Sequence, residues 1–340
     1  MTVHSDLRKL VDSATWFATI ALPLPTRFDN SAHRFEIEWK NARRQLSERW
    51  TDDELTSVET LVEGLSYEGG DALMLVLGQH GVTLAEFHDG PVPQLVVHEG
   101  SVPRLAPILE ARQREIPHIV VETDRAGADI TAFRGEEVLL TEQVQGETLH
   151  IHRGPFGGWA QHKYKRRAES VWERNGDDVA EVVAALAGEV GARLIVVAGD
   201  VRAQGFVLAA LPSDLASIAV SIDEGSPDGI ADHVRRLRSN VVAENFTELA
   251  ERLRTGLADG LASVDAHEIL EAAAEGRIDT LLVHDDDLDV PTTARTIADI
   301  PTGARVIDAA IVAALRTDAE IFIVPKLAVM SGPVAAIFRW

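Results

Sequence analysis

Short apolar runs that alternate with longer amphipathic segments constrain the fold of this chain more than any other feature. Runs at 119–122, 192–198 and 280–284 have the length and composition of buried strands, and segments with apolar residues at helical spacing lie between them. Strands that alternate with helices indicate a layered fold with some parallel pairing. The predicted fold class is therefore mixed α/β.

The pattern divides into three units, which we expect to be domains at 1–117, 118–240 and 241–340. In the first we expect an apolar strand over 17–22, a helix over 31–50, a second helix capped by Thr51 and Glu54, and a hairpin formed by 82–88 and 94–98. This N-terminal unit is expected to be an α/β domain.

The other two units are expected to be α/β domains of different kinds. The central unit should hold a strand meander, a glycine-rich stretch, and separate helices over 160–174 and 177–188. The C-terminal unit should be an α/β/α sandwich, in which Asp265 caps a helix and Gly276 ends it.

Composition excludes several classes of protein. The chain has 340 residues, 32 basic and 54 acidic side chains, a net charge of −22 and no cysteine. The absence of cysteine rules out disulfide scaffolds, thiolate zinc sites and cysteine nucleophiles, and no apolar run is long enough to span a bilayer. We expect a soluble, cytoplasmic protein that makes no membrane contact and, being acidic, does not coat DNA or RNA unspecifically.

One window departs from this acidic background. Residues 153–174 hold six basic side chains and two acidic ones. At helical spacing Lys163, Arg166, Arg167, Ser170 and Arg174 share one face, and apolar residues occupy the other. A glycine-rich tip before a basic helix suits insertion into RNA, where phosphates surround the tip. The alternative is a solvated amphipathic helix after an ordinary Gly/Pro turn.

The window RGPFGGWAQHKYKRRAESVWERN, which starts at Arg153, resembles the glycine-glycine-glutamine loop and basic helix of the archaeal and eukaryotic class 1 release factors. The segments AHEILEAAAEGRIDTLLVHDDD and SGPVAAIFRW resemble the C-terminal domain that these factors share with Pelota. The chain is thus similar to the bacterial branch of that superfamily, which includes the Balon-type ribosome hibernation factors. The resemblance extends from about residue 118 to the end and is loose in the first unit.

The resemblance implies a loop that enters the peptidyl-transferase centre, but Trp159 stands where the release factors have glutamine. Indole has one N–H donor, no acceptor, and a bulk that would fill the space of the attacking water. We therefore expect a plug without ester hydrolysis and without enzyme activity, since Gln161 should already lie in the helix. The implied loop residues are Gly154, Pro155, Phe156, Gly157, Gly158, Trp159, Gln161 and His162. The expected contacts to ribosomal RNA are Arg153, Lys163, Lys165, Arg166, Arg167 and Arg174.

The resemblance also implies partners. These are the ribosome, through 23S and possibly 16S rRNA, and a translational GTPase such as elongation factor Tu. In the N-terminal unit, Arg43, Arg44 and Arg49 with Trp39 and Trp50 are candidate contacts to the decoding region. The alternative for this cluster is a surface helix face over a tryptophan-containing core.

Three functions stay open at this point: a hibernation factor that occupies the aminoacyl site, a rescue factor that cleaves peptidyl-tRNA, and a binding scaffold unrelated to the ribosome. We expect no cofactor and no metal. His150 and His152 lack a carboxylate partner, Asp285–Asp287 with Asp289 should be a solvated turn, and Gly199-Asp200 follows a strand without a phosphate-binding fingerprint.

Overall fold

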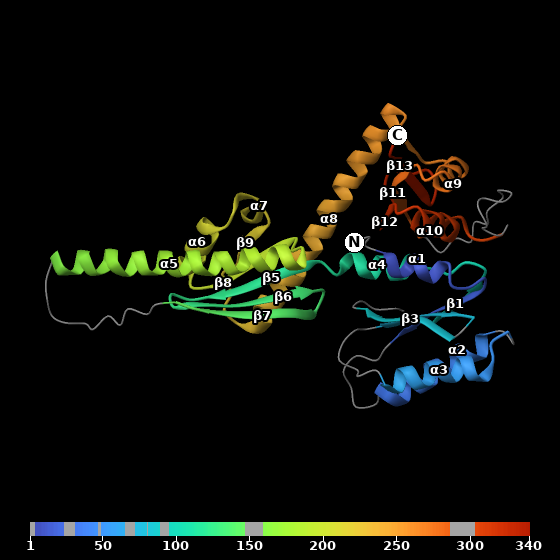
Figure 1. Ribbon diagram of the computed structural model, residues 1–340, viewed down its shortest axis with the longest axis horizontal. Helices are drawn as coiled ribbons and strands as arrows, with labels where there is room; N and C mark the ends of the chain where they lie inside the picture. Colours follow the sequence, from blue (N-terminus) through green and yellow to red (C-terminus); the bar gives the residue numbers. More distant parts are fainter. Residues whose placement is uncertain are drawn as a thin grey trace. The chain divides into compact units, whose positions relative to one another are not determined.

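The computed structural model describes residues 4–23, 31–46, 49–64, 72–79, 81–88, 95–146, 159–285 and 303–340, with side chains left out at 31–35, 62–64 and 159–168. The described residues form three sheets and their covering helices, so the predicted mixed α/β class is confirmed (Figure 1). The chain divides into two compact units. We call Arg114–Glu244 the central unit, and Met1–Gln113 together with Asn245–Trp340 the outer unit. The division into three domains stays a prediction.

The central unit is built on a five-stranded sheet of order β7-β6-β5-β8-β9. Neighbours β5, β6 and β7 are antiparallel, whereas β5, β8 and β9 are parallel, as the sequence pattern indicated. The strands are β5 (Pro117–Thr123), β6 (Gly127–Arg134), β7 (Glu137–Gln145), β8 (Leu194–Gly199) and β9 (Ala219–Ser221), and the helices are α5 (Trp159–Val190), α6 (Val201–Ala210), α7 (Ser213–Ala216) and α8 (Pro227–Asp259), which continues into the outer unit.

Both faces of this sheet are covered because its central strands are apolar on both sides. One face packs against α5 and α6, where Ile119, Val197 and Val183 share a core. The other packs against α8, where Val196 and Ile230 share a second core. The buried strands therefore carry continuous apolar runs, as parallel strands between two helical layers do.

The two predicted helices over 160–174 and 177–188 form one continuous helix, α5. The expected break at Gly176 is wrong, and packing explains why. A Cβ at Gly176 would lie 2.7 Å from Cβ of Phe206, so glycine is needed where α5 crosses α6. The helical propensity lost at one glycine is about 1 kcal/mol, which tertiary packing offsets.

The N-terminal part of the outer unit is an antiparallel sheet of order β3-β2-β1-β4. In Figure 1, α2 and α3 lie on one face of this sheet, and α1 and α4 lie on the other. Its elements are α1 (Ser5–Val11), β1 (Phe17–Pro23), α2 (Ser31–Gln45), α3 (Asp52–Gly64), β2 (Ala72–Gly78), β3 (Gly81–His88), β4 (Val96–Gly100) and α4 (Ala106–Arg114).

Two predictions in this part met different outcomes. The capping box is confirmed: the Glu54 amide donates to Thr51 Oγ1 at 3.3 Å, and the Thr51 amide donates to Glu54 Oε2 at 2.8 Å. The hairpin of β3 with β4 is wrong, because β4 pairs with β1, for example Val97 with Ile20, and lies at the opposite edge from β3. Strand pairing over this distance leaves no local trace in the sequence.

Arg112 joins three elements of the same part. Its guanidinium donates to Glu86 on β3 and to Asp6 on α1. Burial raises the pKa of Glu86, but hydrogen bonds from His88 and Arg112 outweigh it and lower this pKa to about 2. The ionised form of Glu86 therefore helps to hold α4 against the sheet.

The C-terminal part is the predicted α/β/α sandwich, around a sheet of order β10-β13-β11-β12. The cores place α9 and α10 on one face and the second half of α8 on the other. Asp265 caps α9 by accepting from two backbone amides, and Gly276 ends it with φ +72°, both as predicted. The further elements are β10 (Ala262–Ser263), α9 (Ala266–Ala274), β11 (Ile278–Val283), α10 (Val306–Arg316), β12 (Glu320–Ile323) and β13 (Val334–Phe338).

The two parts of the outer unit share one apolar core, which includes Leu7 of α1, Leu109 of α4 and Ile311 of α10. Gln113 adds a contact that resembles strand pairing. Its side-chain amide donates to the carbonyl of Ile323 at 2.6 Å and accepts from the amide of the same residue at 3.0 Å. The Gln113 side chain thus makes the two backbone hydrogen bonds at Ile323 that a neighbouring strand would otherwise make.

The acidic run at 285–289 is only partly described. Asp285 does not lie in a solvated turn, as we expected, but accepts two hydrogen bonds from Arg305 at 3.0 and 3.2 Å. Arg305 is 6% exposed and also contacts Asp308, which is 1% exposed. The other three aspartates of the run lie outside the described residues. None of the described helices combines the length and apolarity needed to cross a lipid bilayer.

Candidate functional site

The predicted glycine loop lies outside the described residues. This holds for Arg153, His150, His152 and residues 154–158. The structure describes both ends of this segment: Gly146, directly after β7, and Trp159, the first residue of α5. In the sequence the motif thus lies between β7, an edge strand of the central sheet, and the 32-residue helix α5.

After this loop, the basic window is helical from Trp159 onward. We call residues 159–174 of α5 the stem; the side chains of 159–168, which include Gln161, His162 and four of the basic residues, lie outside the described ones. Further along, Asn175 and Val179 are buried, whereas Ser170 and Arg174 are exposed. At 3.6 residues per turn, positions 163 and 167 are in line with 170 and 174, and so opposite the buried face.

The stem is the part of α5 that extends beyond the sheet. Among the described side chains of α5, the buried ones start at Asn175 and continue to Ala187, and Figure 1 shows the first turns of the helix extending beyond the strands. Of the described stem side chains, Trp172 is half-buried and Glu173 is exposed. A basic helix that projects from its domain can approach RNA on several sides.

Arg125, which the sequence analysis did not single out, holds the root of the stem. It belongs to the turn between β5 and β6. Its guanidinium lies over the Trp172 ring, 4.9 Å from the centroid, and contacts Asp200 Oδ2 through Nη2 at 3.0 Å and Nε at 3.1 Å. Its carbonyl accepts a hydrogen bond from Asn175 Nδ2 at 3.0 Å.

The Asp200 carboxylate contacts two kinds of group within the chain, the Arg125 guanidinium and the first backbone amides of α6. It is the N-cap of α6, where its carboxylate accepts from the amides of Arg202 and Ala203 at 3.0 and 3.3 Å. Burial tends to raise the pKa of Asp200, but hydrogen bonds from Arg125 and from these amides outweigh it and hold the pKa below its ordinary value. The contacts that the structure describes for this carboxylate are thus with groups of the chain itself.

Close backbone contacts tie the start of the glycine-loop segment to the same turn. The Gly146 amide donates to the Ala126 carbonyl at 2.6 Å. A Cβ at Gly146 would lie 2.3 Å from the Asn175 side chain, and a Cβ at Gly127 would lie 1.9 Å from the Val144 carbonyl oxygen. Only glycine allows these approaches, so Gly146, the residue directly before the glycine-loop segment, is held at the β5–β6 turn.

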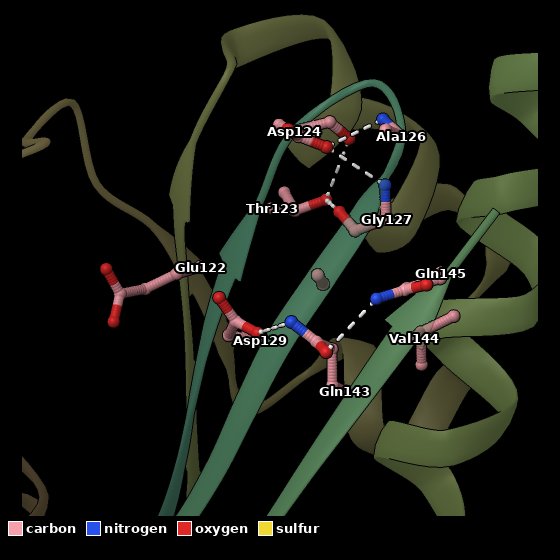
Figure 2. Close-up of a pocket in the computed structure, with 10 residues that line it drawn as sticks. Glu122, Thr123, Asp124, Ala126, Gly127, Asp129, Gln143, Val144 and Gln145 are labelled. Carbon is pink, nitrogen blue, oxygen red and sulfur yellow. Dashed lines mark hydrogen bonds between the residues drawn. The ribbon is translucent and has the colours of Figure 1, made fainter. Parts of the chain in front are cut away.

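A hollow of about 310 Å³ lies beside this turn, at the ends of β5, β6 and β7. Figure 2 shows Asp129, Gln143 and Gln145 joined in a row of hydrogen bonds, with Asp124 bonded to the turn amides and Glu122 directed away from them. None of the lining residues is basic and three are acidic. The hollow is therefore unsuited to phosphate.

The arginines predicted to meet the decoding region have partners within the outer unit. Arg43 contacts Asp52 at 2.6 Å and Glu59 at 2.9 Å, and the guanidinium of Arg49 lies 4.4 Å from the centroid of the Trp16 ring. Arg44 is exposed. Trp39 and Trp50 are buried, with indole N–H groups bonded to Glu59 and Glu99 respectively, so they belong to the core beneath this face.

No group of three or more metal-ligating side chains comes together in the part of the chain that the structure describes. The features that define the site are therefore the projecting basic stem and its root at the β5–β6 turn. Among the described residues, this root is held by a cation–π contact, an ion pair and hydrogen bonds.

The comparisons assign the class. The central segment is release-factor-like: residues 117–259 match the family model described as Bacterial archaeo-eukaryotic release factor family 2. The match runs from the first residue of β5 to the last residue of α8 and covers less than half of the chain. It confirms, for this segment, the resemblance to the release factors that the glycine loop and basic helix carry.

Solved structures give weaker likenesses over nearly the whole length. An archaeal Pelota, from a model of ribosome-bound Pelota and ABCE1, is 15% identical with a TM-score of 0.43, covering 98% of this chain and 92% of that one. Archaeoglobus fulgidus Pelota is 15% identical with a TM-score of 0.36, covering 99% and 91%. The archaeal translation termination factor aRF1 is 14% identical with a TM-score of 0.27, covering 98% and 96%. A comparison with curated proteins gave no match.

Proposed function

We propose that this chain is a ribosome-binding factor that occupies the aminoacyl site and places residues 154–162 in the peptidyl-transferase centre as a plug. The observation that carries the proposal is the stem. It carries five basic and two acidic side chains in an acidic chain, it projects from its domain, and it directly follows the glycine loop. Phosphates attract such an element, and the acidic remainder disfavours other modes of RNA contact.

The factor binds without cleaving the peptidyl-tRNA ester. Trp159 is the first residue of α5, which puts Gln161 inside the first helical turn. An indole at the third motif position cannot accept a hydrogen bond from a water and occupies the volume that the water needs. A protection role in hibernating ribosomes during stress follows from a plug that binds but does not react.

The proposed partners are 23S rRNA at the stem, 16S rRNA at the N-terminal sheet, and a translational GTPase such as elongation factor Tu at the C-terminal part. The proposed place of action is the cytoplasm. On α2, which covers one face of the N-terminal sheet, Arg44 is the better candidate for an RNA contact, since Arg43 already pairs with Asp52 and Glu59.

Co-sedimentation with 70S ribosomes, followed by chemical footprinting of 23S rRNA, tests the proposal. We expect salt-sensitive binding and protection of nucleotides in the peptidyl-transferase centre. Binding to ribosomes without any footprint there would overturn the plug. No binding at all would favour a scaffold unrelated to the ribosome.

A hydrolysis assay separates the plug from a rescue enzyme. Ribosomes that carry labelled peptidyl-tRNA are mixed with the protein, and we expect no release above background. Gln161→Ala serves as the matched variant. Release by the natural protein that this substitution abolishes would show that Gln161 acts as the missing motif glutamine and would overturn the proposal.

A further inference from the structure

We propose that Arg125 is a positioning residue. Together with Trp172 and Asp200, a set that we call the Arg125 clamp, it fixes the direction in which the stem leaves the central unit. The effect of the clamp on ribosome binding rests on the function proposed above. Its effect on the stem does not, and it can be measured in the free protein.

The first argument is the position of the clamp along α5. From Asn175 onward the helix is held by a buried face. Before Trp172, the described residues Glu169, Ser170 and Val171 are exposed or half-buried and belong to none of the apolar cores. Trp172 is thus the first residue of the described stem at which an aromatic contact restrains the helix.

The second argument is the chemistry of the contact. A guanidinium is planar, so its face can stack on an indole while its edge donates to a carboxylate. Arg125 does both, with Trp172 at 4.9 Å and with Asp200 at 3.0 and 3.1 Å. A lysine has no face to stack and cannot present two donors in a fixed fork.

The third argument is that the other side of the clamp is rigid. Asp200 caps α6, and its amide donates to the Thr123 carbonyl at 2.9 Å. Gly199 has φ +106°, and a Cβ there would lie 2.0 Å from the Thr123 carbonyl oxygen. The carboxylate is therefore held by two elements of the sheet layer, β5 and α6, before Arg125 reaches it.

Because the stem is long, a small rotation at the clamp produces a large displacement at the N-terminal end of the stem. From Trp172 back to Ala160 the helix measures about 18 Å, at 1.5 Å per residue. A rotation of about 10° at the clamp would displace Ala160 by about 3 Å, and functional groups need to be held within about 0.5 Å and 10–20°. A stem that carries the phosphate contacts therefore needs a restraint of this kind at its base.

Distance measurement in the free protein tests the clamp directly. The chain has no cysteine, so spin labels can be attached at Ala160→Cys on the stem and Glu142→Cys on β7 without other changes. We expect a narrow distance distribution that Arg125→Ala broadens or shifts, and that Arg125→Lys restores only in part. An unchanged distribution in Arg125→Ala would overturn the clamp.

Two further variants test whether the broadening comes from loss of the Arg125–Asp200 contact. Asp200→Asn retains an N-cap for α6 and removes only the charge that Arg125 contacts, so it should also broaden the distribution. Arg202→Ala removes an exposed positive charge beside the clamp and should leave the distribution unchanged. If Arg202→Ala broadens the distribution as much as Arg125→Ala, the effect is one of charge and the positioning role is refuted.

Ribosome binding by unlabelled protein provides the functional readout. At one salt concentration, Arg125→Ala should weaken binding about three- to thirtyfold, the range set by one exposed cation–π contact and one surface ion pair. Arg202→Ala should weaken it clearly less. Equal losses in the two variants would refute positioning as the cause. Failure of the natural protein to bind ribosomes would refute the proposed function, and the distance measurement would still decide on the clamp.

Discussion

Substitution of Gly176 by alanine tests the tight crossing of α5 and α6. The new Cβ would lie 2.7 Å from Cβ of Phe206 and 3.1 Å from its carbonyl carbon, whereas ordinary carbon contacts lie at about 3.5–4.0 Å. The two helices must therefore separate by about 1 Å at this point. Overpacking of this kind costs about 1–3 kcal/mol, and the gain in helix propensity returns about 1 kcal/mol. The expected net loss is about 1 kcal/mol.

Gly205, in the middle of α6, is the matched control. It is exposed, and a Cβ there would meet nothing within 4 Å, so Gly205→Ala should stabilise the unit by about 0.5–1 kcal/mol. Hydrogen exchange of peptides from α5 and α6 reads this unit separately from the rest of the chain. Exchange should be about fivefold faster in Gly176→Ala and slower in Gly205→Ala, since 1.4 kcal/mol corresponds to tenfold. If both substitutions slow exchange alike, α5 and α6 do not cross tightly at Gly176, and packing against Phe206 does not explain the glycine within α5.

Three further predictions address charge, pH and capping. Joint charge reversal at Lys163, Arg166 and Arg167 should reduce the slope of log K against log salt for ribosome binding by about two to three, and an unchanged slope in a salt titration would count against the stem. Because the folded-state pKa of Glu86 is depressed to about 2, its contribution to stability is present above about pH 4.5 and is lost as the pH falls through 2. Glu86→Gln should therefore flatten the fall of melting temperature over this range, and a slope equal to that of the natural protein would contradict the assignment. Asp265→Ala should lower the unfolding free energy of the outer unit by about 1 kcal/mol in urea titrations, through the lost cap of α9; a change near zero would show that the cap is dispensable.

Local signals in the sequence predicted local structure well. Thr51 with Glu54, and Asp265 with Gly276, mark helix ends through hydrogen bonds and a positive φ that involve residues only a few positions apart. The apolar runs likewise predicted β5, β8 and β11, because a strand buried on both faces must be apolar throughout.

The failures concern contacts between residues far apart in the chain. Gly176 looks like a helix break until Phe206 is placed against it, 30 positions later. The partner of β4 is β1 rather than β3, and nothing in the sequence of either edge strand marks the choice. Asp285 belongs to an acidic run whose composition predicts a solvated turn. Its carboxylate nevertheless accepts a hydrogen bond from Arg305, which lies 20 positions later in the chain.

The candidate site shows the same limit. The basic face and the glycine motif were recognisable because they lie in one window. Arg125 was not, since an exposed arginine in a turn has no local feature that distinguishes it from other surface arginines. Its role depends on Trp172 and Asp200, which come from two other elements. A turn could be predicted from Asp124 and Gly127, but not what the turn holds.

The shared core of the outer unit has a consequence for synthesis of the chain. That core joins Leu7 to Phe338, and Gln113 satisfies the edge of β12. At about 5–20 residues per second, translation takes on the order of 10–45 s to pass from Gln113 to Phe338. Until α10 has been made, the apolar sides of α1 and α4 lack this covering helix, whereas every residue of the central unit has been made once translation passes Glu244. The N-terminal third therefore completes its apolar core late in synthesis and is prone to aggregation until then, and the middle of this protein can fold before its beginning does.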